Sequence, residues 1–531
     1  MDAELQSRLE SLYLSNEPPS SQDATLISEI LQDRRARIFE LEKNLVKFRM
    51  EIKFYESLLS GIRKLPPELL AEIFMHYATS CRDGRDFSGY YFYPRPHTDG
   101  PMRISAVCRT WRAIVFSTPT LWNYISLPHR TPFGCTNYAE LVERCITNSR
   151  VSPLYIKVSV FGSPERYRTA EARNLKYSGA LDTLDKFMPE MYRWNSFHLD
   201  MFASRSICTQ LERKLPSIPP TGAPNLMEMY FRAFTPDRDA LEVAWALELL
   251  CSSINLRKIL FVAPIWDLEA APWESLQHFE SKQGMRLRDL FLVLRGCPAL
   301  QYCEVCFELE EEPPCLPSFT ESDPVIVLSQ LHTLRLTHLR QAELSTVLQW
   351  ITVPTLTELT LAGHHVSDTW LDPLFISFLS RSACRLHTLS LSQFSYSDAN
   401  IMNYLRLPNV HDTLETLELD KWRTPISQEL LDFLTFKFSE GGPSLILPKL
   451  KNITFTIHAI VQAVRLREFF LSRWYEPERN HAAFPVQALQ EMRALLLVPV
   501  KDMVELHFET CIVDGGTDYP EIEKLAGLDM I

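Results

Sequence analysis

The cysteines of this sequence include the side chains best spaced to hold a metal ion. Cys303 and Cys306 have the CxxC spacing of many zinc sites, and Cys297 and Cys315 lie nearby. The surrounding residues predict a β-strand, however, and residues three apart on a strand point to opposite faces. We therefore expect Cys303 to pack in a core, and we expect no metal site.

The other reactive side chains form no recognisable catalytic set. His364 and His365 follow a predicted strand, where a solvated turn is expected, and Glu308–Glu312 form an acidic run typical of a solvated loop. The 16 glycines include no GxG, so neither a dinucleotide fingerprint nor a phosphate loop is present. HExxH, GxSxG and kinase motifs are also absent. We expect no enzymatic activity and no cofactor.

Composition indicates a globular protein with more than one structural unit. The chain has 531 residues, 46% of them hydrophobic and 23% charged. A net charge of -12 argues against nucleic acid or an anionic membrane as partner, but basic proteins stay possible. The twelve cysteines follow no disulfide framework, and neither a signal sequence nor a membrane span is apparent. These features favour the cytoplasm or the nucleus.

The N-terminal region predicts a flexible tail followed by a long helix. Residues 1–22 include Asn16, Pro18 and Pro19, which favour a tail. Residues 23–60 carry a heptad pattern that only Arg34 interrupts, and Gly61 is suited to a left-handed cap. The heptad positions are Ile27, Leu31, Arg34, Ile38, Leu41, Leu45, Phe48, Ile52, Tyr55 and Leu59.

This helix has two possible partners. Residues 27–59 could form a homodimeric coiled coil, or the helix could fold back onto its own domain. In a parallel dimer Arg37 would meet Glu42 favourably, but Glu51 would meet Glu56 unfavourably. A second apolar stripe beside the heptad positions favours packing against more than one surface. Its residues are Val46, Met50, Phe54 and Leu58.

Two short segments after Gly61 carry closely spaced apolar side chains. Leu65 precedes two prolines, which suit the first turn of a helix, and an apolar helical face follows at Leu69, Leu70, Ile73 and Phe74. A second apolar face is expected over Ile104, Val107, Cys108, Trp111 and Val115, followed by Thr118-Pro-Thr-Leu-Trp122.

The ordered pair LPPELLAEIF and ISAVCRTWRAIV, with a following LW, resembles an F-box. The resemblance is closest to the F-box-like proteins of mushroom-forming (basidiomycete) fungi, and it covers residues 62–125. It implies docking on a Skp1-type adaptor within a cullin-RING ubiquitin ligase. The resemblance assigns nine residues to the adaptor interface: Leu65, Pro66, Leu69, Leu70, Ile73, Phe74, Val107, Cys108 and Trp111. Val107, Cys108 and Trp111 should also support the fold.

The free energy of burial also favours a partner. Each large apolar side chain left in water lacks roughly 1.5–3 kcal/mol of burial free energy, and a helix-binding groove on a partner would cover these side chains. The alternative is that both faces join the core of the following domain. The segment departs from the family in an insertion over 77–101. Its aromatic residues could pack beside the F-box-like domain or alter adaptor affinity; they are Phe87, Tyr90, Tyr91, Phe92 and Tyr93.

Residues 150–531 contain an internal repeat, apolar-x-x-apolar-x-apolar. It starts at Trp194, Leu226, Leu256, Leu300, Leu331, Leu356, Leu386, Leu414, Leu450 and Met503. The four copies at 331–414 are spaced by 25, 30 and 28 residues, with predicted helices at 342–351, 373–380 and 428–434 between strands. This resembles leucine-rich-repeat F-box proteins. The predicted fold is α/β: a long helix and a helical F-box, then an irregular solenoid with a curved parallel sheet and outer helices.

The repeat geometry also predicts a binding surface. Leucines of each strand point inward, so the residues between them face the concave side. That side should present eight acids and three bases, which suggests a basic client protein; the alternative is a merely solvated acidic surface. The residues are His198, Asp200, Glu228, Tyr230, Arg232, Lys258, Tyr302, Glu304, Arg335, Glu358, Glu418, Asp420, Glu505, His507 and Glu509.

Together these patterns predict a substrate-recognition adaptor that docks on a Skp1-type protein and recruits clients for ubiquitination. The alternative is a non-catalytic leucine-rich scaffold outside a ubiquitin ligase.

Overall fold

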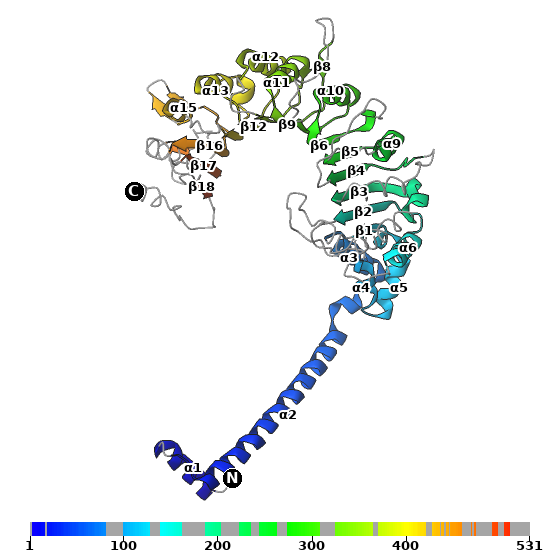
Figure 1. Cartoon of the computed structure of the whole chain (residues 1–531), viewed down its shortest axis with the longest axis vertical. Helices are drawn as coiled ribbons and strands as arrows, with labels where there is room; N and C mark the ends of the chain where they lie inside the picture. Colours follow the sequence, from blue (N-terminus) through cyan, green and yellow to red (C-terminus); the bar gives the residue numbers. More distant parts are fainter. Residues whose placement is uncertain are drawn as a thin grey trace, which may run out of the picture. The chain divides into compact units, whose positions relative to one another are not determined.

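The computed structural model (Figure 1) describes most of the chain in segments. These are residues 3–15, 18–80, 99–127, 138–161, 186–202, 222–234, 244–262, 273–307, 324–364, 370–420, 427–435, 437–439, 442–444, 446–458, 469, 472–473, 491–497 and 504–509. The chain divides into two compact units, Met1–Thr79 with Ile104–Val115, and Ser80–Arg103 with Phe116–Ile531.

The first unit begins with helices α1 (Ala3–Ser15) and α2 (Ser21–Leu59). The prediction of a flexible tail over 1–22 is wrong for residues 3–15, because the helix-breaking Pro18 and Pro19 lie after α1 rather than within it. The long N-terminal helix is present as α2. Ser20 caps it by accepting a hydrogen bond from the Asp23 amide, and Arg8 pairs with Asp23.

The end of α2 differs from the predicted left-handed cap at Gly61. Ser60 leaves the helix with φ −56° and ψ 130°, and Gly61 begins the 3-10 helix η1 (Gly61–Lys64). The chain therefore continues through a tight turn without a positive φ at this glycine.

Three helices follow: α3 (Pro67–Ser80), α4 (Asp99–Ser105) and α5 (Arg109–Ser117). The single apolar helical face expected from Ile104 to Val115 is wrong, because the chain breaks between α4 and α5. The Arg112 side chain donates to the Ser105 carbonyl at 3.0 Å, and the Trp111 amide lies 3.4 Å from Cys108 Sγ. These contacts give the two helix ends the partners that their free backbone groups require.

The second unit is built on one long sheet (Figure 1). Neighbouring strands are parallel throughout, except that β17 and β18 are antiparallel. In spatial order they are β1 (Tyr124–Leu127), β2 (Leu154–Phe161), β3 (Trp194–Phe202), β4 (Glu228–Phe234), β5 (Lys258–Val262), β6 (His278–Met285), β7 (Tyr302–Phe307), β9 (Thr333–Leu339), β11 (Glu358–Gly363), β12 (Thr388–Ser392), β13 (Thr416–Asp420), β16 (Asn452–His458), β17 (Glu491–Leu497) and β18 (Val504–Glu509). Two small pairs stand apart, β8 (Ile326–Val327) with β10 (Ile351–Thr352), and β14 (Lys437–Ser439) with β15 (Gly442–Ser444).

Helices connect the strands. They are α6 (Tyr138–Ser149), α9 (Ala244–Ser252), α10 (Leu287–Gly296), α11 (Gln341–Trp350), α12 (Asp372–Ser382), α13 (Asp398–Leu405), α14 (Pro408–His411) and α15 (Gln428–Leu434), with 3-10 turns η2 (Pro119–Leu121), η4 (Met188–Arg193) and η6 (Trp273–Ser275). This parallel sheet with intervening helices is the predicted α/β, solenoid-like class.

Each of the ten predicted repeat segments overlaps a strand of the sheet, and all but the one at Trp194 begin one or two residues before it. The sheet also contains β1, β2, β6 and β17, which the repeat pattern missed. In β6, for example, His278, Glu280 and Ser281 surround one large apolar residue, Phe279. The last predicted repeat, at Met503, gives the antiparallel strand β18, so the parallel repeat ends before it.

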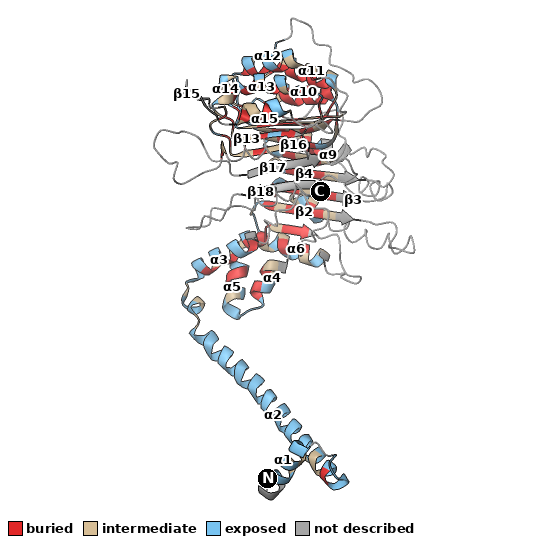
Figure 2. Cartoon of the chain, turned by 90° about the vertical axis from the view of Figure 1, so that its left-hand side faces the viewer, coloured by how far each residue is buried: buried red, intermediate tan, exposed pale blue. Residues whose placement is uncertain are grey.

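Buried residues, red in Figure 2, occur in the strands and in the helices that connect them. In strands such as β5, β7 and β11 alternate residues are buried, and the leucines of β9, β11 and β12 stack in register. The stacked row at the centre comprises Leu334, Leu359, Leu389 and Leu417. The opposite side chains of the strands form what we call the open face.

Polar side chains hydrogen-bond one connection to the next. Asn225 donates to the Tyr192 carbonyl at 2.7 Å, and Asn255 donates to the Pro224 carbonyl at 2.8 Å. Arg381 donates in the same way to the Leu348 and Ile351 carbonyls at 2.6 and 2.9 Å. Carbonyls that would otherwise lack partners between repeats are thereby satisfied.

Candidate docking surfaces

Helix α3 carries two apolar stripes rather than the single face predicted. Leu70 and Phe74 are 4% and 2% exposed, whereas Leu69 and Ile73 are 51% and 43% exposed. Each pair has i, i+4 spacing, so the buried and exposed stripes lie side by side along the helix. Tyr77 extends the exposed stripe and was missed by the sequence analysis, although the same spacing could have identified it.

The buried stripe joins α5. The Phe74 ring contacts the Trp111 ring at a centroid distance of 4.7 Å. The residues predicted to bind the adaptor are thus distributed over three environments: Pro66, Leu69, Ile73, Val107 and Cys108 are exposed, Leu65 and Trp111 are half-buried, and Leu70 and Phe74 are buried. The exposed members on α3 leave an apolar stripe for a partner to cover. Most of the insertion over 77–101, including its aromatic cluster, lies outside the described residues.

At the centre of the open face, acidic and basic side chains neutralise one another. His278 stacks on Tyr302 with the ring centroids 4.1 Å apart, and its Nε2 lies 2.5 Å from Glu280. Lys282 bridges Glu280 and Glu304, each at 3.3 Å. On the far side of the cluster, Arg335 pairs with Glu304 at 3.9 Å and Glu358 at 3.4 Å, and lies over the Tyr302 ring. We call these seven residues the central cluster.

The pKa directions agree with this mutual pairing. Burial alone would raise the pKa of Glu280, but the contacts with His278 and Lys282 together lower it. Burial would likewise lower the pKa of Lys282, but Glu304 and Glu280 raise it. The Glu280 carboxylate is therefore ionised, and all three carboxylates of the central cluster already have basic partners.

A second polar cluster occupies the N-terminal strands. Arg232 Nε donates to Asp200 Oδ1 at 2.5 Å, and its Nη2 also contacts this carboxylate. Burial nevertheless raises the pKa of Asp200 and lowers that of Lys157. Burial, with the charges of Lys157 and Lys258, lowers the pKa of His198 to about 4, and its ring lies 5.6 Å from that of Tyr230. Burial raises the pKa of Tyr230 to about 12.

The predicted client-binding residues therefore differ in accessibility. Tyr230, Arg232, Tyr302, Glu304 and Arg335 are half-buried, as is Glu358, and most of them are engaged with neighbours. Glu418 on β13 is exposed. Asp420 lies on β13 and Glu505 and His507 on β18, but their side chains are outside the described part of the chain.

The CxxC cysteines occupy opposite faces of β7, as expected from strand geometry. Cys303 is buried with a thiol pKa raised to about 12 by burial, whereas Cys306 is half-buried on the open face with its Sγ 3.0 Å from His338 Nδ1. The two sulfurs cannot share one metal ion in this strand. Among the described residues, no group of three or more metal-binding side chains is assembled.

The chain thus consists of a helical unit with an exposed apolar stripe on α3, followed by a parallel α/β repeat region. Residues 62–128 match the F-box-like family, so the chain contains an F-box-like domain. This domain supports an F-box protein. In general terms it also supports a role in substrate recognition by Skp1–cullin–F-box ubiquitin ligases. No curated protein matches the chain. Within the described segments, no helix is both long enough and apolar enough to span a membrane.

Proposed function

We propose that this protein is a non-catalytic substrate-recognition adaptor. The F-box-like domain docks on a Skp1-type protein within a cullin-RING ligase, and the open face of the sheet recruits a client protein for ubiquitination. The observation that carries the proposal is the exposed apolar stripe of α3, which lies within the matched residues 62–128. An exposed helix face of this kind gains stability when a partner groove covers it.

The test is binding of the purified chain to a recombinant Skp1-type protein. The double substitution Leu69→Ala/Ile73→Ala should weaken binding at least about tenfold, because it removes two apolar anchors without touching the buried Leu70 and Phe74. Glu72→Ala/His76→Ala is the matched control on another exposed part of α3 and should bind normally. A parent chain that does not bind at all would leave the leucine-rich scaffold as the better description.

The client is proposed to be a basic protein segment. The repeat region is compatible with leucine-rich repeats, whose strand faces commonly bind partners. Because the carboxylates of the central cluster are already paired, the acidic residues beyond it, such as Glu418, supply the charge available to a client. We therefore propose that recruitment occurs toward the C-terminal strands of the open face. We further propose that the adaptor acts in the cytoplasm or the nucleus.

Self-association through residues 27–59 of α2 is the last part of the proposal. Most of the heptad side chains of this helix are exposed, and the described part of the chain does not cover them. A dimer would present two F-box-like domains and two open faces in one particle.

A further inference from the structure

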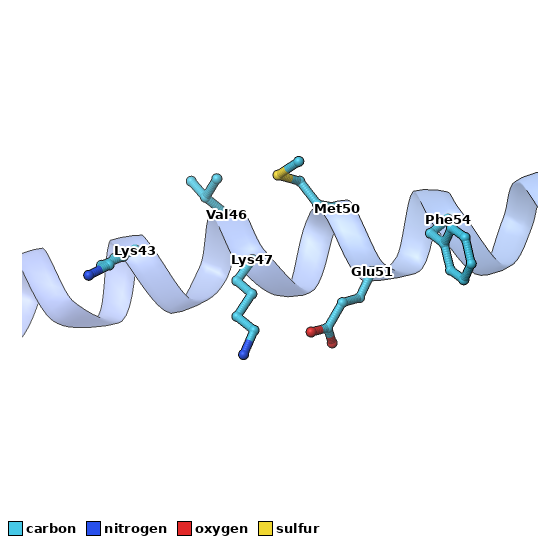
Figure 3. A pocket seen from close by; sticks show the side chains of 6 residues that line it. All are labelled: Lys43, Val46, Lys47, Met50, Glu51 and Phe54. Atoms are coloured by element: carbon cyan, nitrogen blue, oxygen red, sulfur yellow. The ribbon is translucent and has the colours of Figure 1, made fainter. Parts of the chain in front are cut away.

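Helix α2 is exposed along most of its length (Figure 2), and its exposed residues include large apolar ones from Leu31 to Leu59. Figure 3 shows the shallow hollow on one side of it, lined by Lys43, Val46, Lys47, Met50, Glu51 and Phe54. All six side chains come from the same helix, so the hollow is part of an open surface rather than a cavity. None of the six is a heptad position, so the pairing surface proposed below lies beside the hollow. An apolar surface of this extent is typical of a binding site.

We propose that two copies of the chain pair through α2 in antiparallel orientation, with residues 27–59 fully overlapped. This inference rests on the self-association included in the proposed function and specifies its geometry. The overlap places residue 59 of each copy beside residue 27 of the other. At about 1.5 Å per residue, the two C-terminal ends of α2 then lie roughly 50 Å apart. The two F-box-like domains consequently emerge from opposite ends of the pair.

The heptad side chains match in this overlap. Leu31 faces Tyr55 of the second copy, and Ile38 faces Phe48 of the second copy. Leu41 faces Leu45 on either side of the two-fold axis. Each buried aromatic ring contributes roughly 150–250 Å², so Phe48 and Tyr55 of both copies supply a large share of the about 1,200–2,000 Å² of a stable interface.

The interruption at Arg34 distinguishes the two orientations. In a parallel pair the two Arg34 side chains would meet at one layer of the seam, where like charges repel in a poorly solvated environment. In the antiparallel pair each Arg34 lies beside Ile52 of the second copy. Its aliphatic stem can cover this residue while the guanidinium reaches water.

The residues flanking the seam also favour the antiparallel orientation. Arg37 then faces Glu51 of the second copy, and this attractive contact occurs twice. Ile30 and Leu58 form an apolar contact on the same edge, and the two Asn44 side chains meet at the axis. The opposite edge, formed by Arg35, Glu42, Arg49 and Glu56, brings both like charges (Arg35 with Arg49, Glu42 with Glu42) and unlike charges (Arg35 with Glu56, Glu42 with Arg49) together and does not discriminate. A parallel pair would gain the contact of Arg37 with Glu42 but would oppose Glu51 and Glu56, so its attractive and repulsive contacts offset each other.

Glu51→Lys tests the orientation because the antiparallel pair predicts weaker dimerisation of this variant and the parallel pair predicts stronger dimerisation. In the antiparallel pair the introduced ammonium would face Arg37 twice, so the dimer dissociation constant measured by sedimentation equilibrium at low salt should rise about tenfold. In a parallel pair the introduced ammonium would face Glu56 and strengthen association. Glu40→Lys makes the same charge change outside the seam and should leave the dissociation constant within about twofold.

A mixing experiment gives a second readout on the full-length chain. Arg37→Glu and Glu51→Lys variants should each associate weakly alone, but an equimolar mixture should form heterodimers, since both edge contacts then become attractive. Tighter association of Glu51→Lys, or no preference for heterodimers, would overturn the antiparallel arrangement while leaving self-association intact. A parent chain that is monomeric at tens of micromolar would overturn the self-association itself, independently of Skp1-type binding.

Discussion

The neighbours of a side chain, rather than its residue type, determine what the charged residues of the open face can do. Glu304 and Glu358 were predicted to attract a basic client, but both are paired with Arg335. Glu418 has the same side-chain chemistry and is exposed. The difference arises from register, because Arg335 on β9 lies directly opposite Glu304 on β7.

His198 provides a residue-scale prediction. Its pKa is about 4 in the folded chain, because burial and nearby lysines disfavour the charged imidazole, against an ordinary value of 6.5. The unfolded chain therefore binds more protons between these values, so stability is full above pH 6.5 and declines as the pH falls toward 4. The loss is at most about 1.4 kcal/mol per pH unit, and less because the ring is only half-buried.

Urea unfolding at pH 7.5 and pH 5 measures this effect. His198→Gln should reduce the stability difference between the two pH values by about 1 kcal/mol. His76→Gln, which changes an exposed histidine, should not reduce it. An unchanged pH dependence in His198→Gln would show that the ring titrates normally in the folded chain.

At the scale of elements, buried hydrogen bonds join the C-terminal connections of the sheet. Arg473 is 2% exposed and donates to the Leu434 carbonyl at 2.9 Å and the Leu447 carbonyl at 3.0 Å, as well as to the Ile446 carbonyl. Burial lowers its pKa to about 10, so it remains charged at neutral pH. One side chain thereby connects the end of α15 to the loop preceding β16.

Arg473→Met should destabilise this region by about 3 kcal/mol or more, because it leaves several buried carbonyls without donors. Hydrogen exchange over residues 427–458 should accelerate, while exchange in β3 and β4 should stay unchanged, since repeat units are stabilised mainly by their neighbours. Arg473→Lys should rescue only partly, because an ammonium lacks the planar set of five donors. Arg385→Met, at an exposed position, is the control. Hydrogen exchange over residues 427–458 that is as slow in Arg473→Met as in the parent chain would contradict the assigned role.

At the scale of the whole molecule, the two proposed docking surfaces lie in different compact units. The exposed stripe of α3 belongs to the first unit and the open face to the second. A substitution on one surface should therefore leave the other intact, provided that the fold is maintained.

Glu418→Lys/Asp420→Lys should abolish capture of a basic client identified by proximity labelling, because it reverses the charge of the acidic surface, and should leave binding to the Skp1-type protein unchanged. Leu69→Ala/Ile73→Ala should show the reverse behaviour. Thr388→Lys, at a half-buried position of the neighbouring strand β12, adds a cation without removing an acid and controls for positive charge alone. Unchanged client capture in the double lysine variant would refute the acidic surface.

The sequence by itself determined the features that depend on local periodicity. The long helix, the ten repeat positions and the opposite orientations of Cys303 and Cys306 all follow from side-chain directions that repeat every 3.6 or 2 residues. The F-box-like segment was likewise recognisable from two short motifs.

Only the tertiary structure decided which of these side chains remain accessible. Leu69 and Leu70 are identical in type and adjacent in sequence, yet one is exposed and the other buried. Strand β6 and the pairing of Glu304 with Lys282 and Arg335 depend on neighbours far along the chain. Burial and ion pairing are properties of packed neighbours, and their sequence separation leaves no local pattern from which they could be predicted.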